Sequence, residues 1–529
     1  MRLLQVLLIA FACTLSYGKV ELNPVFMDHM VLQRDIPAKV YGTADTESSV
    51  KVSIASQTVK AKVKDGKWTA RLKPIKAGGP YTLKVSGDNT IELKDVLVGD
   101  VWLCTGQSNM AGMLRSYVAF GDGMFKEFKN EPGNYHNDQI RLMTVKSAAE
   151  DEPQEAIGVQ QAWVPCNPDS AMDFSVTGFY FGKYLQPEAG VPIGLIKSAI
   201  GGTSVLSWTD LDVMRANPVA KRVYLDPHEK DVANWPANKA RWERRLDEWK
   251  KKRAAGENVG RQPQMPNGPE HPKRPAAYFN AMLHPLQDFA IKGAIWYQGE
   301  NEANRELGEE YKTTFALMIE SWRDAWGQGD FPFVFVQLAA FRKVEDAPGD
   351  DPWARLRDAQ SYTLQAVPDT GMAVAIDAGL TTNIHPPYKK LVGKRLAAQA
   401  MSVAYGKKGI STGPMYSSMK LKKGKLYLKF DYIGKGLEAR AVTLDPYGDS
   451  PYKLSAKSLE GFTIAGQDKV FYKAQARVTA KDTIEVYSPE VRDPVAVRYA
   501  WAAFPLCNLY NKDGFAASPF RTDDWPAGQ

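Results

Sequence analysis

Between residues 97 and 405, short apolar segments alternate with longer amphipathic ones, and this pattern restricts the fold more than any other feature of the sequence. The apolar segments are 101–104, 192–197, 293–297, 333–337 and 372–376. The amphipathic segments, which we expect to be helices, are about 176–186, 308–325, 354–366 and 388–404. Unbroken apolar strands are buried on both faces, so the pattern predicts an α/β fold with three layers, α/β/α, around a parallel sheet.

On both sides of residues 97–405, the sequence contains short runs in which apolar and polar residues alternate. SVKVSI and YTLKV, separated by glycine-rich turns, predict an N-terminal β-sandwich domain over 19–96. KLYLKFDYI, TIEVYS and VAVRYAWA predict a C-terminal β-rich domain over 406–529. A chain of 529 residues is too long for one core.

An insertion over 220–275 divides the predicted α/β domain into two parts, 97–219 and 276–405. Trp242, Leu246 and Trp249 share one face of a helix within it, and a proline-rich connector follows.

The first 18 residues, MRLLQVLLIAFACTLSYG, have one arginine, an apolar run and small residues near the end. This pattern predicts a signal peptide over 1–18, and therefore a secreted or periplasmic protein. The alternative is a lipoprotein site at Cys13. No later segment is apolar and uncharged over a membrane-spanning length, so we expect no membrane span.

Charge and cysteine content exclude several classes of protein. The net charge is +7, or +6 without Arg2, and the positive residues form no stripe with interleaved aromatic residues, so we expect no nucleic-acid partner. Cys104, Cys166 and Cys507 allow either one disulfide or three buried thiols. The chain has no CxxC or HExxH motif and its six histidines are scattered, so we expect no metal site and no cofactor. The oligomeric state stays open.

Polar residues that follow four of the predicted strands are the candidate functional residues. They are Gln107, Ser108, Asn109, Gly201, Gly202, Gln298, Glu300, Asp377, Asn383 and His385. The carboxyl ends of parallel strands meet at one edge of a sheet, where ligands bind, so we expect these residues to converge.

This set of residues fits acyl transfer. A serine hydroxyl becomes nucleophilic when a base takes its proton, and His385 suits that task near neutral pH. Backbone N–H groups at Ser108 and at Gly201-Gly202, with the side chain of Gln298, are candidate donors to an oxyanion. Taken singly, each motif also has a structural interpretation as a turn or a helix cap.

LVGDVWLCTGQSNM and AIWYQGENEA resemble motifs of the sialate O-acetylesterase family of SGNH-type hydrolases, which also includes acetylxylan esterase-like bacterial enzymes. The resemblance extends over nearly the whole chain through NPVFMDHMVLQRDIPAKVYGTA, GVPIGLIKSAIGGTSVLSW, IHPPYKKLVGKRLA and LYNKDGFAASPFRTDDWP. It implies an SGNH-hydrolase-like fold and hydrolysis of acetyl esters on sugars. By the resemblance, Ser108 is the nucleophile, His385 the base, and Gly202 and Gln298 donors to the oxyanion.

The sequence departs from the family pattern at several positions. Asn383 stands where an acid is common before the histidine, Leu206 replaces a common glutamate, and Asn301 and Glu302 are also out of pattern. A serine–histidine pair needs a group that orients the imidazole. We therefore expect Asp377, Asn383 or a backbone carbonyl to orient His385.

Two alternatives to a carbohydrate O-acetylesterase stay open. One is a non-catalytic carbohydrate-binding protein, suggested by Asn383. The other is a hydrolase of other acyl groups or a peptidase. The expected partner is an O-acetylated carbohydrate, either a sialoside or a plant or algal polysaccharide. A sialate carboxylate calls for a cation, for which Arg115, Arg305 and Arg357 are candidates.

Overall fold

The computed structural model describes residues 19–45, 49–119, 135–344, 349–446 and 451–526. The predicted signal peptide over 1–18, with the alternative lipoprotein site at Cys13, lies outside the described residues. Within the described ranges, none of the helices has the length and apolar composition needed to cross a membrane.

A mainly parallel sheet with the strand order β10-β9-β11-β8-β12-β13-β14 forms the centre of the molecule. The five predicted strands are all present in it, and only β10 at the edge runs antiparallel to its neighbour. The chain adds strands on both sides of β8, so the strand order reverses there. The bounds are β8 Thr90–Gly106, β9 Asn137–Val145, β10 Val159–Cys166, β11 Ile193–Ala199, β12 Gly293–Tyr297, β13 Phe333–Gln337 and β14 Thr370–Val374.

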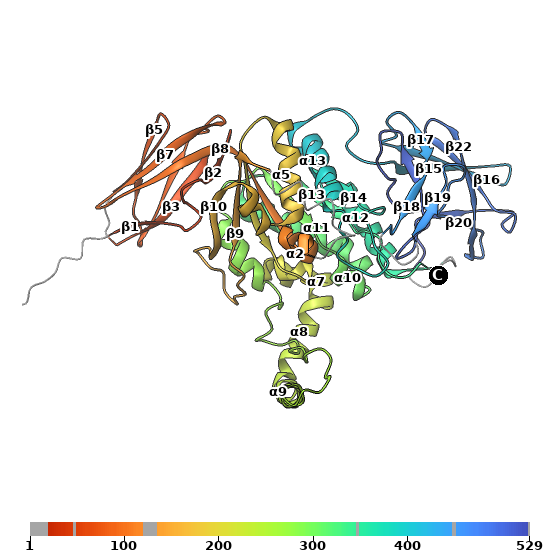
Figure 1. The fold of residues 1–529 in the computed structure, drawn as a ribbon, viewed down its shortest axis with the longest axis horizontal. Coiled ribbons are helices and arrows are strands. Elements are labelled where there is room, and N and C mark those ends of the chain that lie inside the picture. Colours follow the sequence, from red (N-terminus) through yellow and green to blue (C-terminus); the bar gives the residue numbers. More distant parts are fainter. Residues whose placement is uncertain (1–18, 46–48, 120–134, 345–348, 447–450, 527–529) are drawn as a thin grey trace, which may run out of the picture.

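Helices cover both faces of this sheet, as the buried strands require (Figure 1). Helices α5 (Val176–Ala189) and α13 (Lys389–Tyr405) pack together on one face. Helices α11 (Gly308–Trp326) and α12 (Pro352–Ala366) pack on the other. Every residue of β11, β12, β13 and β14 is buried, as expected for strands of an α/β sheet that helices cover.

Strand β8 belongs to two parts of the molecule. Its first half pairs with the N-terminal strands β2 and β7, and its second half pairs with β11 and β12. The predicted boundary between 96 and 97 therefore falls inside a continuous strand. The N-terminal strands are β1 Val20–Leu22, β2 Val31–Gln33, β3 Ala38–Ala44, β4 Ser49–Ile54, β5 Gln57–Lys62, β6 Lys67–Leu72 and β7 Gly78–Ser86.

The C-terminal region is rich in β-structure, as its alternating sequence predicts. Two four-stranded antiparallel sheets have the orders β15-β16-β23-β22 and β21-β20-β24-β26, and two further pairs are β17-β25 and β18-β19. The bounds are β15 Met415–Lys422, β16 Lys425–Asp431, β17 Leu437–Ala439, β18 Val442–Leu444, β19 Tyr452–Leu454, β20 Phe462–Ala465, β21 Phe471–Lys473, β22 Gln475–Ala480, β23 Thr483–Tyr487, β24 Ala496–Tyr499, β25 Leu509–Asn511 and β26 Phe520–Arg521.

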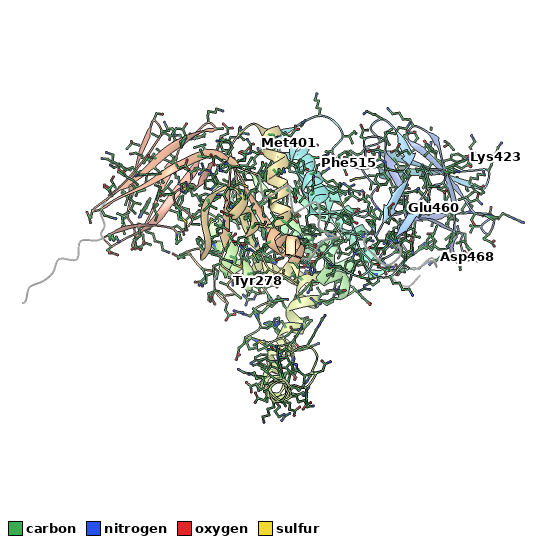
Figure 2. The ribbon with its side chains drawn as sticks, in the orientation of Figure 1. Tyr278, Met401, Lys423, Glu460, Asp468 and Phe515 are labelled. Carbon is green, nitrogen blue, oxygen red and sulfur yellow. The ribbon has the colours of Figure 1, made fainter. Side chains whose placement is uncertain are left out.

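The insertion is mainly helical and extends away from the layered body (Figure 1). Its elements include α6 Leu211–Ala216, α7 Pro218–Ala220, a π-helical turn Lys221–Leu225, α8 Asp226–Ala233 and α9 Trp235–Ala254. The predicted apolar face of α9 packs on the proline-rich connector, because Trp242 and Trp249 donate to the carbonyl oxygens of Pro263 and Gly260. Figure 2 labels Tyr278, which stacks on Trp208 at 5.2 Å where the chain re-enters the body.

Cys104, Cys166 and Cys507 are buried free thiols, so the second of the two cysteine alternatives applies. Burial raises the pKa of each thiol. The three residues therefore stay protonated and pack as small apolar side chains.

Candidate active site

The end of β8 presents Ser108 through a tight turn. Gly106 has φ = 129°, and a Cβ at this position would lie 2.3 Å from the carbonyl oxygen of Tyr297. Only glycine therefore lets β8 approach β12 so closely. After Gln107, the short helix α1 (Ser108–Ala111) begins with Ser108, which is half-buried at the carboxyl edge of the sheet.

His385 meets Ser108 although 277 positions separate them in the sequence. The distance from Ser108 Oγ to His385 Nε2 is 2.8 Å. His385 lies in the loop between β14 and α13, and its backbone N–H donates to Asn383 Oδ1 at 2.9 Å. Burial, followed by the positive charge of Lys389, lowers the pKa of His385. The imidazole is therefore neutral near pH 7 and able to accept the serine proton.

Asp377 is engaged elsewhere, so the expectation that it orients His385 is wrong. Its carboxylate accepts hydrogen bonds from both terminal nitrogens of Arg395, at 2.5 and 2.8 Å, and from Tyr510 Oη at 2.8 Å. Burial alone would raise the pKa of Asp377, but the charge of Arg395 outweighs it and lowers the pKa.

Asn383 acts on the backbone of the histidine loop rather than on the imidazole, because its Oδ1 accepts from the His385 N–H. In the described part of the chain, neither Asp377 nor Asn383 makes a hydrogen bond to the imidazole. The physical reason is that a carboxylate beside a buried arginine is held there by a bidentate ion pair.

Gly201 and Gly202 follow β11 and lie beside the serine. A Cβ on Gly201 would lie 3.5 Å from Ser108 Cβ, and Gly202 has φ = 68°. Within the described residues, the backbone N–H groups of Ser108 and Gly202 donate to no acceptor. Both amides are thus open to a ligand at the carboxyl edge of the sheet.

Gln298 is buried and fully hydrogen-bonded, so the expectation that it donates to an oxyanion is wrong. Its Nε2 donates to the carbonyl oxygen of Thr203 at 3.0 Å and to the carboxylate of Glu302, and its Oε1 accepts from Tyr311 Oη at 2.8 Å. Glu302 also accepts from the Val205 N–H at 2.7 Å. Gln298 therefore ties the segment after β11 to the segment after β12.

Gln107, Asn109 and Glu300 are also buried, with exposed fractions of 3%, 1% and 2%. Burial leaves little of these three side chains accessible to a ligand. Asn109 and Glu300 bond to each other, since Asn109 Nδ2 donates to Glu300 Oε1 at 2.5 Å.

A cavity of about 220 Å³ lies between the Gly202 turn and the insertion, and neither Ser108 nor His385 is among its lining residues. Gly202, Asn301, Lys273 and Arg305 are among the residues that line it. A Cβ on Gly202 would lie 2.7 Å from Lys273 Nζ, so the cavity reaches the turn next to the serine. Among its described lining residues, only Asp231 is acidic. The cavity therefore suits an anionic group.

The three candidate arginines have different surroundings. Arg357 is buried and donates to four backbone carbonyl oxygens. Arg115 pairs with Asp173 on the surface. Arg305 is exposed, lies 4.5 Å from the centroid of the Tyr224 ring and lines the cavity. Of the three, only Arg305 lines this cavity.

Comparison with known proteins agrees with this geometry. The family profile described as carbohydrate esterase, sialic acid-specific acetylesterase, matches residues 98–224 and 271–402. Sialate O-acetylesterase of Rattus norvegicus is 28% identical over 93% of this chain and 92% of its own length, and that of Homo sapiens is 26% identical over 94% and 92%. The crystal structure of a carbohydrate acetylesterase from Xanthomonas citri is 34% identical, with a TM-score of 0.77, over 96% of this chain and all of that chain.

The chain belongs to the sialic acid-specific acetylesterase family of carbohydrate esterases. It is accordingly a carboxylic ester hydrolase. The non-catalytic alternative suggested by Asn383 is not favoured.

The family match is interrupted between 224 and 271, where the insertion lies. Part of the cavity lining, including Asp231 and Asn267, comes from this interval. Sequence reasoning did not select Lys273 or Lys389 as site residues. No local motif marks them, although Lys389 comes only four positions after His385 in the sequence.

Proposed function

We propose that this esterase removes acetyl groups from sugar hydroxyls through an acetyl-serine intermediate, on an SGNH-hydrolase-like fold. The 2.8 Å contact between Ser108 Oγ and His385 Nε2 is the observation that carries the proposal. His385 takes the hydroxyl proton while Ser108 Oγ attacks the acetyl carbonyl carbon.

The tetrahedral intermediate carries its negative charge on the former carbonyl oxygen. The open N–H groups of Ser108 and Gly202 are the donors we assign to it, each contributing about 3–4 kcal/mol in the transition state. The imidazolium then returns its proton to the sugar oxygen as the carbon–oxygen bond breaks. Water, deprotonated by His385, attacks the acetyl-serine and releases acetate and the free serine.

For the substrate, we propose an acetylated sugar that carries a carboxylate, as sialates do. Lys273 and Arg305 in the cavity that begins at the Gly202 turn support this choice, because cations recognise carboxylates by charge and hydrogen bonding. Two relatives carry the name sialate O-acetylesterase, which agrees with it. The leader-like sequence over 1–18 supports the further proposal that the protein is exported.

The test is acetate release by Ser108→Ala from O-acetylated sialosides and from acetylated xylo-oligosaccharides. Loss of the nucleophile is expected to lower kcat by more than about a thousandfold. Ser116→Ala, on the neighbouring helix α2 (Leu114–Ala119), is the control and is expected to keep wild-type turnover. Circular dichroism checks that both variants fold. A folded Ser108→Ala protein with wild-type turnover would disprove the assignment of the nucleophile.

A further inference from the structure

Asn109, the residue after the nucleophile, is the centre of a buried hydrogen-bond chain that the reaction steps above do not use. Its Oδ1 accepts from Lys389 Nζ at 2.5 Å, and its Nδ2 donates to Glu300 Oε1 at 2.5 Å. The same Nδ2 donates to the carbonyl oxygen of Ile384 at 3.1 Å. The carboxamide therefore joins an ammonium to a carboxylate and also holds the residue that precedes His385.

These three side chains, Asn109, Lys389 and Glu300, are named here the Asn109 relay. Lys389 is completely buried, and Glu300 is 2% exposed. Burial of an ammonium and a carboxylate costs several kcal/mol for each ion unless hydrogen bonds and charge attraction offset it. Asn109 directly follows Ser108 in the chain, so its backbone connects these buried polar groups to the nucleophile. They can therefore influence the positions of Ser108 and His385.

His385 lacks the carboxylate partner that orients the base in a catalytic triad. In the part of the chain that the structure describes, its imidazole makes no side-chain hydrogen bond other than that to Ser108. The backbone around it is held instead. The His385 N–H donates to Asn383, Asn109 holds the Ile384 carbonyl oxygen, and Lys389 anchors the first residue of α13.

We propose that the Asn109 relay keeps His385 in register with Ser108 and so supplies the orienting part of a triad carboxylate's role. The inference rests on the acetyl-serine mechanism proposed above. The relay residues contact neither substrate nor the reacting atoms, so they are positioning residues.

The relay also sets the electrostatic environment of the base. The titratable groups that face the Lys389 ammonium are Glu300 on α10 (Glu300–Asn304) and the phenols of Tyr117 and Tyr297, whose ring centroids lie 5.6 and 5.2 Å from Nζ. Burial lowers the pKa of Lys389 to about 7, so Lys389 is charged on the acid limb, where burial and then this charge lower the pKa of His385. An uncharged residue at 389 removes the second cause, so the pKa of His385 rises and the acid limb of kcat/KM moves to higher pH.

The test compares Asn109→Ala and Lys389→Met with the wild-type protein in hydrolysis of p-nitrophenyl acetate from about pH 5 to 9. Displacement of reacting groups by about 1 Å costs about a hundredfold in rate. We therefore expect kcat of Asn109→Ala to fall about a hundredfold while KM changes by less than about threefold. Lys389→Met is expected to move the acid limb to higher pH, and NMR titration of the His385 ring is expected to show the same direction.

Arg498→Met is the matched control, because it breaks an equally buried ion pair in the C-terminal β region. Arg498 donates to Asp523 at 2.8 Å, and the two side chains are 2% and 1% exposed. This variant is expected to lose stability while kcat and the acid limb stay unchanged. Lys389→Met keeps the length of the side chain. If Asn109→Ala does not fold, the acid limb of Lys389→Met and the NMR titration of its His385 ring still test the proposal.

Folded relay variants with wild-type kcat and an unmoved acid limb overturn the proposal, as does a change no larger than that in Arg498→Met. Failure of the acetyl-serine mechanism would give a different result, because Ser108→Ala would then retain turnover. If Ser108→Ala is inactive and the relay variants match the wild-type protein, the assignment of Ser108 as the nucleophile is supported. The proposed role of the Asn109 relay is then disproved.

Discussion

Replacement of Gly106 by alanine tests whether the turn that presents Ser108 depends on close approach of two backbones. An added Cβ would lie 2.3 Å from the carbonyl oxygen of Tyr297, at φ = 129°. A residue forced into such a conformation costs about 1–3 kcal/mol. Displacement of packed neighbours adds about 1–3 kcal/mol. Gly106→Ala is therefore expected to lower the free energy of unfolding by about 2–6 kcal/mol.

Gly190→Ala separates backbone conformation from close approach. Gly190 has φ = 66°, and no atom lies within 4 Å of an added Cβ once its chain neighbours are set aside, so only about 1–2 kcal/mol is expected. Urea denaturation followed by tryptophan fluorescence measures both variants. Because Gly106 sets the position of Ser108, Gly106→Ala is also expected to lose about a hundredfold in kcat, whereas Gly190→Ala keeps it. Equal unfolding free energies, or wild-type kcat in Gly106→Ala, would refute this reasoning.

Two further substitutions test the surroundings of the serine. Arg305→Ala is expected to raise KM about tenfold for an acetylated sugar acid, equivalent to about 1.4 kcal/mol, with no change for a neutral acetylated xylo-oligosaccharide; an equal effect on both substrates contradicts a carboxylate contact. Asp377→Asn removes one partner of a buried ion pair and is expected to cost about 3–5 kcal/mol of stability at neutral pH. Because the folded pKa of Asp377 lies below its ordinary value of 3.8, this stability is present above pH 3.8 and is lost as the pH falls through the folded pKa. The kcat of folded Asp377→Asn is expected to change by less than about tenfold; a loss of about 10⁴ would restore Asp377 as a triad acid.

Sequence reasoning identified the layered fold because burial leaves a strong local pattern. A strand covered on both faces has no polar alternation, and β11, β12 and β13 show that directly. Strands β9 and β10 escaped prediction because NDQIRLMTV and VQQAWVPC mix polar and apolar residues. Of the two, only β10 is an edge strand, since β9 lies between β10 and β11. The meeting of Ser108 and His385 also followed from pattern, since both come after parallel strands.

The sequence by itself thus determined which segments form the sheet and at which edge the reactive groups gather. Only the tertiary structure decided which polar side chains face that edge and which turn inward. Asn109 and Ser108 are adjacent in sequence, yet Asn109 is buried against Glu300 and Lys389, which lie 191 and 280 positions away. The direction of a side chain after a strand depends on such distant partners, because a buried polar group must find its hydrogen bonds wherever the packing brings them.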